Sequence, residues 1–180
     1  MQRVQWTSLT VYTKLFTPPQ LLFGFCNKAA QWVAARGVPV IRSLIDACRR
    51  KGVAVIYTTS DFGEDGWNRG SWEWKNARTG EDVSRPRESN RKPSDIVDEI
   101  TPAPQDIVIR KLKPSAFFGS PLTSYLTLLS ADSIIVAGTT TSSCVRGTVI
   151  DAFSENLRVT LDGNGFYGGH WRIGGKFVTE

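Results

Sequence analysis

The stretch from Ile134 to Ala152 (IIVAGTTTSSCVRGTVIDA) contains Cys144, a residue that could act as a nucleophile. An apolar run that predicts a buried strand ends at Gly138, a polar turn follows, and Cys144 falls in the first turn of the next predicted helix. The N–H groups and the dipole at a helix N-terminus favour an anion, and they lower the pKa of a cysteine from about 8.5. The same N–H groups could stabilise an oxyanion formed when the thiolate attacks a carbonyl. The alternative interpretation of Cys144 is a small, buried apolar residue.

A second stretch, Ile107 to Ser120 (IVIRKLKPSAFFGS), carries a cation that could serve the same chemistry. Lys111 lies at the carboxyl end of a predicted strand, where its ammonium could reach the same rim as Cys144 and stabilise the thiolate or a tetrahedral intermediate. The alternative is that Lys111 is a solvated surface residue, as most lysines after a strand are. The residues from Ser115 to Phe118 are more typical of packing than of chemistry.

Other kinds of site find little support in the residues. The remaining cysteines, Cys26 and Cys48, show no CxxC spacing, and Cys48 falls on the apolar face of a predicted helix. The one histidine, His170, cannot build a histidine-rich metal site, so no metal or other cofactor is expected. Sparse cysteines and a start, MQRVQWTS, that lacks the apolar core of a signal peptide predict a reducing compartment, the cytoplasm.

The elements that must position these residues alternate along the chain. Continuous apolar runs are typical of parallel strands that helices cover on both faces, and between the runs lie segments with helical spacing. Right-handed crossovers then give an α/β fold with a doubly wound, mostly parallel sheet, which binds ligands beyond the carboxyl ends of its strands. The predicted strands are 53–59, 106–109, 133–137 and 157–161, and the predicted helices are 39–51, 120–130 and 143–156.

Two segments do not follow this alternation. The segment 60–93 has little periodicity but holds Trp67, Trp72 and Trp74 beside Arg69, which is typical of a substrate lid or a subunit contact, with simple packing as an equal alternative. The glycine-rich segment 162–180 has no helical pattern, so no helix is expected to close the sheet there.

Length and composition limit the number of domains and the kinds of partner. A chain of 180 residues, 41% of them hydrophobic, is expected to form a single domain with one compact core. No apolar stretch approaches the roughly 20 residues of a membrane helix, so no membrane contact is expected. The net charge of +5 is modest and scattered, which argues against nucleic acid as a partner.

The two stretches together resemble the isochorismatase-like cysteine hydrolases, particularly their N-carbamoylsarcosine amidase branch. The resemblance covers about residues 16–161, within a single domain taken as 1–180. The family's lysine, four residues before Ser-Ala-Phe, is matched by Lys111, Ser115, Ala116, Phe117, Gly119 and Ser120. Its nucleophile motif is matched by Gly138, Thr141, Cys144, Val145, Arg146, Thr148, Asp151 and Ala152.

The resemblance implies a three-layer αβα fold and a reaction. Cys144 would attack the carbonyl carbon of an amide or carbamoyl group in a small molecule, forming a covalent acyl-enzyme that water hydrolyses, and Lys111 would be the catalytic lysine. The backbone N–H groups of Thr141 and Cys144 would bind the oxyanion, beside a cis peptide between Thr140 and Thr141. No cofactor is implied, and the chain is expected to form a homo-oligomer.

The sequence also departs from the family at both ends, 1–15 and 162–180, so the fold is expected to be incomplete there. Relatives carry an aspartate at the end of the first strand, and aligning Leu15 to Pro18 on the segment that follows it puts Thr10 at that position. Threonine cannot take the thiol proton at neutral pH. Asp61 or Asp65 could substitute, and the alternative is a catalytically impaired homologue that acts as a binding or oligomer subunit.

Overall fold

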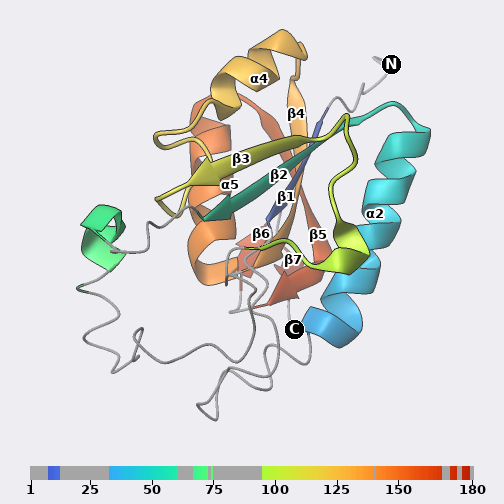
Figure 1. Ribbon diagram of the computed structural model, residues 1–180, viewed down its shortest axis with the longest axis horizontal. Coiled ribbons are helices and arrows are strands. Elements are labelled where there is room, and N and C mark those ends of the chain that lie inside the picture. Colours follow the sequence, from blue (N-terminus) through green and yellow to red (C-terminus); the bar gives the residue numbers. More distant parts are fainter. Residues whose placement is uncertain are drawn as a thin grey trace.

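The computed structural model shows a five-stranded sheet in which every neighbouring pair of strands is parallel, in the order β3-β2-β1-β4-β5 (Figure 1). The strands are β1 (Ser8–Tyr12), β2 (Ala54–Ser60), β3 (Ile107–Lys111), β4 (Ser133–Thr139) and β5 (Arg158–Tyr167). The structure describes residues 8–12, 33–60, 67–72, 74, 95–139, 141–167, 171–173 and 176–178.

Three helices of the described ranges flank the sheet, with shorter helical turns between the elements. Within the described ranges, no helix is both long and apolar enough to cross a membrane. A separate antiparallel pair, β6 (Trp171–Ile173) and β7 (Lys176–Val178), follows β5. The helices are α2 (Val38–Arg50), α4 (Leu122–Leu128) and α5 (Arg146–Ser154), and the turns are η1 (Val33–Gly37), η2 (Trp67–Arg69), η3 (Asp98–Ile100) and η4 (Thr141–Val145).

The α2 helix forms where its spacing predicts. Val38, Ile41, Ile45 and Cys48 recur at helical intervals and are all buried against the sheet. Arginines occupy the last turn, where cations complement the helix dipole. The chain then turns at Gly52, whose φ of +68° favours glycine.

Two apolar clusters occupy the two faces of the sheet, and Figure 1 shows α2 on one side with α4 and α5 on the other. The first cluster joins α2 to Val55, Tyr57 and Ala137. The second joins α4 and α5 to the opposite face, through residues such as Ile56 and Val136. Neighbours along β2 thus point to opposite faces, as strand geometry requires. The predicted three-layer α/β architecture is confirmed.

The observed elements differ from the predicted ones at several ends. The β1 strand lies at the centre of the sheet although Ser8–Tyr12 is no continuous apolar run. The predicted helix 120–130 is shorter and spans only Leu122–Leu128. Pro121 precedes its first residue, and the Ser120 hydroxyl accepts a hydrogen bond from the N–H of Leu122. The last strand continues to Tyr167, well beyond the predicted end at Leu161.

Candidate active site

Lys111 is the last residue of the edge strand β3, and it is buried. Only 5% of its surface is exposed, which is rare for a lysine unless the charge has partners. The chain after β3 curls back, and the Nζ atom donates hydrogen bonds to the carbonyls of Lys113 and Pro114, at 2.7 and 2.9 Å. These carbonyls compensate the ammonium for the water that it loses.

Cys144 lies beyond the carboxyl end of β4, in the turn η4 that runs directly into α5. The strand leaves the sheet through Gly138, whose φ of +124° is a conformation that side chains rarely adopt. The following turn is π-helical. Such turns are rare in proteins, and those that occur are often found at functional sites. This strand-turn-helix path puts Cys144 in the first turn of a continuous helical segment, as predicted.

The structure brings the two side chains together. Lys111 Nζ lies 3.8 Å from Cys144 Sγ, in a buried contact between residues 33 positions apart in the chain. Cys144 is 7% exposed and belongs to the apolar cluster beneath α4 and α5, which excludes water from the contact. A cation held this close in a low-dielectric setting interacts strongly with negative charge that develops at the sulfur. The pair can therefore serve nucleophilic chemistry on an electrophilic carbon.

A hydroxyl group links the segment after Lys111 to the cysteine turn. Thr148 on α5 is fully buried, and its Oγ1 donates to the carbonyl oxygen of Cys144 at 2.9 Å. The same Oγ1 accepts a hydrogen bond from the N–H of Ala116, at 3.0 Å. Gly147 lets α5 approach this segment, because a Cβ there would meet the backbone nitrogen of Ser115 at 3.3 Å.

The tryptophan segment packs beside the same loop. The indole Nε1 of Trp72 donates to the carbonyl of Leu112 at 3.0 Å, next to the carbonyls that hold Lys111. Trp67 and Trp74 are 80% and 65% exposed, and Arg69 ends the short turn η2. The spacing of the tryptophans gave no sign of the contact between Trp72 and Leu112, which joins segments 40 positions apart.

The backbone of Thr10 lies in the middle of β1, in register with Ile56 on one side and Val136 on the other. Tyr12 ends the strand two residues later, in register with Gly138. Thr141, the other expected oxyanion donor, begins η4, three residues before the cysteine. The predicted cis peptide at Thr140, together with Asp61, Asp65, Cys26 and His170, lies outside the described residues.

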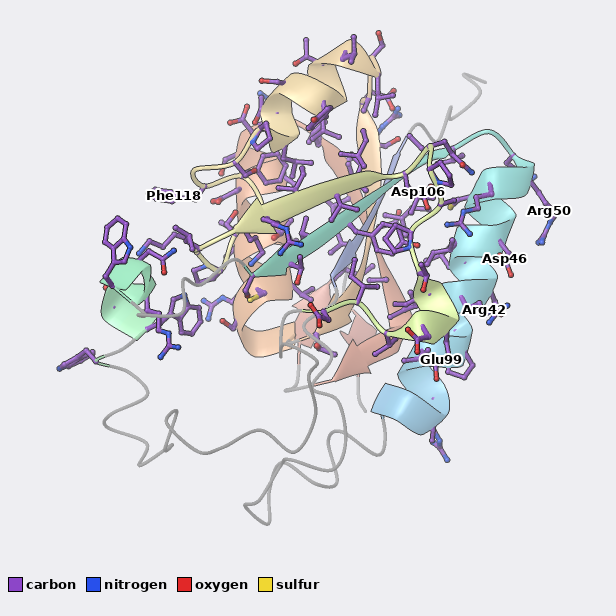
Figure 2. The ribbon with its side chains drawn as sticks, in the orientation of Figure 1. Arg42, Asp46, Arg50, Glu99, Asp106 and Phe118 are labelled. Carbon is purple, nitrogen blue, oxygen red and sulfur yellow. The ribbon has the colours of Figure 1, made fainter. Side chains whose placement is uncertain are left out.

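The opposite face carries a different arrangement. A cavity of about 180 Å³ lies against α2, and Figure 2 shows Arg42, Asp46 and Glu99 gathered there, far from Phe118. Arg42 and Arg49 line this cavity together with the acidic residues. Among the side chains that the structure describes, no three His, Cys, Asp or Glu residues gather as metal ligands do.

Comparison with solved structures identifies the class of fold. N-carbamoylsarcosine amidase from Thermoplasma acidophilum superposes with a TM-score of 0.70 at 23% sequence identity, over 92% of this chain and 86% of that one. A cysteine hydrolase from Pseudomonas syringae pv. phaseolicola gives 0.72 at 23% identity, over 97% and 78%. The architecture is thus the isochorismatase-like hydrolase fold.

Sequence comparison then gives the family. A family model described as the isochorismatase domain matches residues 22–168, and the chain belongs to the isochorismatase family. N-carbamoylsarcosine amidase of an Arthrobacter species is 35% identical over 124 residues, 67% of this chain and 46% of that protein. Ureidoacrylate amidohydrolase RutB of Pseudomonas syringae pv. syringae is 29% identical over 150 residues, 73% and 59%. The chain spans about half the length of these curated relatives.

Proposed function

We propose that the chain is a cysteine hydrolase that cleaves a non-peptide C–N bond, in the amide or carbamoyl group of a small molecule. The contact between Lys111 Nζ and Cys144 Sγ, 3.8 Å apart and buried, carries the proposal. Its family includes proteins named for amide hydrolysis, N-carbamoylsarcosine amidase and ureidoacrylate amidohydrolase among them. Both observations favour attack at an amide carbonyl.

The reaction proceeds through a covalent intermediate. The Cys144 thiolate attacks the carbonyl carbon, the C–S bond forms, and the carbonyl oxygen becomes an oxyanion. The backbone N–H groups of Thr141 and Cys144 stabilise that oxyanion at the head of the helical segment. The C–N bond then breaks as the leaving nitrogen takes a proton from water, and hydrolysis of the thioester returns that proton to the solvent. Water attacks the thioester, which releases the acid and restores the thiolate.

Lys111 supplies the fixed positive charge for these steps. Among the described residues, its Nζ contacts two carbonyl oxygens and the sulfur, acceptors that suit the N–H bonds of an ammonium. A charged lysine in this position stabilises the thiolate before attack and the negative charge that develops afterwards. Lys111 therefore acts as an electrostatic catalyst, and no step requires it to lose its proton.

The exposed tryptophans form the substrate side of the site. Trp67, Trp74 and Arg69 belong to the segment that Trp72 attaches to the loop after Lys111. Aromatic and arginine side chains are favoured at binding surfaces and at subunit contacts alike. A homo-oligomer and a cytoplasmic location remain part of this proposal.

A catalytically impaired homologue is the second candidate, and Thr10 favours it. An alcohol cannot take the thiol proton, and loss of a general base typically lowers a rate by about 10²- to 10⁴-fold. The buried pair of Lys111 and Cys144 favours the enzyme, since a binding subunit has no need of an ammonium beside a thiol.

Release of ammonia from amides and carbamoyl compounds tests both candidates. We expect the wild-type chain to release ammonia, Cys144→Ala to lose at least about 10³-fold in rate, and Cys48→Ala to keep the wild-type rate. Equal rates for the wild type and Cys144→Ala would refute the proposal that the chain is a cysteine hydrolase. If Thr10 occupies the position of the missing base, Thr10→Asp should raise the rate at least about tenfold. If the wild type is active and Thr10→Asp lowers its rate, the alignment of Thr10 with the family's aspartate is wrong.

A further inference from the structure

Thr148 forms hydrogen bonds with two different parts of the site that the structure describes. Its hydroxyl hydrogen goes to the carbonyl oxygen of Cys144, four residues earlier in the same helical segment. Its oxygen accepts from the N–H of Ala116, which follows the loop that holds Lys111. Since a hydroxyl has one donor and two acceptor positions, one side chain satisfies a buried carbonyl and a buried amide at once.

These contacts close a ring around the reacting groups. The ring runs from the Lys111 ammonium to the carbonyls of Lys113 and Pro114, along the chain to Ala116, and through Thr148 to the turn of Cys144. It closes at the 3.8 Å contact between Nζ and Sγ. In this ring, the Thr148 side chain connects the segment 112–116 after Lys111, called the lysine loop below, to the turn η4 that holds Cys144.

A threonine elsewhere in the fold separates the two roles of the hydroxyl. Thr127 on α4 donates to the carbonyl of Thr123 at 2.9 Å, which is the same local bond to the fourth preceding residue. Thr127 is exposed, and within the described residues its hydroxyl forms this local bond alone. Helical threonines commonly make the local bond. The bond from Ala116, 32 positions away, is what distinguishes Thr148.

We propose that Thr148 is a positioning residue that sets the separation of Lys111 Nζ and Cys144 Sγ, an inference that rests on the proposed cysteine hydrolase. Without the hydroxyl, the Ala116 N–H is buried with no acceptor and the lysine loop moves to find one. A displacement of about 1 Å in a catalytic pair costs on the order of 10²-fold in rate. Gly147 supports the same geometry by keeping α5 close to Ser115.

Two variants of Thr148 and one control test the proposal. Thr148→Val keeps the shape and removes both hydrogen bonds, Thr148→Ser keeps the hydroxyl, and Thr127→Val removes a local bond alone. We expect Thr148→Val to lower kcat by about 10- to 100-fold with KM changed less than about threefold. Thr148→Ser should restore at least about a third of kcat, and Thr127→Val should match the wild type.

Alkylation of Cys144 by iodoacetamide at pH 7, measured by mass spectrometry on the folded protein, is the second readout. We expect about tenfold slower alkylation in Thr148→Val and recovery in Thr148→Ser, because the reactivity of the sulfur depends on its distance from the Lys111 ammonium. Should the wild type prove inactive, the proposed function fails while this readout still decides the role of Thr148.

A merely structural role predicts a different pattern. Thr148→Val would then unfold at lower temperature but keep the wild-type kcat and alkylation rate when folded, and that result would overturn the proposal. If Thr148→Val does not fold, Gly147→Ala takes its place, since its new Cβ would press on the backbone nitrogen of Ser115. Slower turnover and slower alkylation in Gly147→Ala support the proposal, and wild-type values for both refute it.

Discussion

The two buried cysteines of the described chain lie on opposite faces of the sheet. Cys48 is 4% exposed and packs with α2, whereas Cys144 is 7% exposed and lies beneath α4 and α5. Both residues belong to clusters of buried hydrophobic side chains, and both are free cysteines. Burial therefore does not distinguish them.

The difference lies in the charged groups that accompany each cysteine. Burial raises the pKa of the Cys48 thiol, and the adjacent Arg49 is paired with Asp106 and within reach of the Tyr57 hydroxyl. On the other face, Lys111 directs its ammonium to the sulfur of Cys144. In the proposed mechanism the ammonium makes Cys144 the nucleophile, whereas a buried thiol without such a contact is typically an inert apolar group.

Removing the cation should erase the difference, and this is the largest effect that we expect. Lys111→Met keeps an unbranched side chain of similar length without the charge. Loss of one preorganised electrostatic donor typically costs about 10²- to 10³-fold, so kcat/KM for amide hydrolysis should fall by about 10³-fold. Steady-state ammonia release measures this change.

The control for this substitution comes from the same strand. Arg110 precedes Lys111 on β3 but is exposed, and Arg110→Met should leave kcat/KM within about threefold of the wild type. If Lys111→Met and Arg110→Met behave alike, the ammonium has no part in the reaction and Cys144 is no different from Cys48.

The second prediction compares the two sulfurs directly. In the folded wild type at pH 7, iodoacetamide should modify Cys144 at least about 100-fold faster than Cys48, because only a thiolate reacts at an appreciable rate. Peptide-level mass spectrometry gives each rate separately. In urea the two rates should become similar, since both environments are lost. Slow labelling of both sulfurs until the protein unfolds would contradict the difference.

The fold was predictable where the local pattern is strong. β2 and β4 are recognisable as short, continuous apolar runs, and α2 as an apolar stripe at helical spacing. β1 could not be predicted from its mixed residues, since its place comes from pairing with β2 and β4 on either side. The extension of β5 likewise depends on pairing, with Phe166 and Tyr167 in register with the end of β4.

The site was predictable in its chemistry but not in its supports. Residue type and position at strand ends point to Lys111 and Cys144, and the family motifs join them. By position alone, however, Lys111 is expected at the surface, and its burial depends on the turn that follows it. The bonds from Trp72 to Leu112 and from Ala116 to Thr148 join distant segments, which no local pattern encodes.

The smallest predicted effect concerns a titratable group on the Cys48 face. Burial raises the pKa of Tyr57 to about 12, although Arg49 acts in the opposite direction. The unfolded phenol ionises near pH 10, so the stability from keeping Tyr57 neutral is fully present below pH 10 and is lost as pH rises through about 12. The full loss amounts to about 3 kcal/mol, since each pKa unit corresponds to about 1.4 kcal/mol.

Tyr57→Phe has no phenol to ionise. Between pH 8 and pH 11.5, its free energy of unfolding should therefore fall less than that of the wild type. Urea titrations at the two pH values measure this difference. At pH 8 the variant lacks only the hydrogen bond between an Arg49 guanidinium nitrogen and the Tyr57 hydroxyl oxygen. This bond is long, at 3.5 Å, and contributes less than about 1 kcal/mol to stability. Ammonia release at pH 8 should not change, because Tyr57 and Cys144 lie on opposite faces. An equal alkaline loss in both proteins would show that Tyr57 ionises as readily when folded. A slower hydrolysis in Tyr57→Phe would show that the two faces act on each other through the sheet.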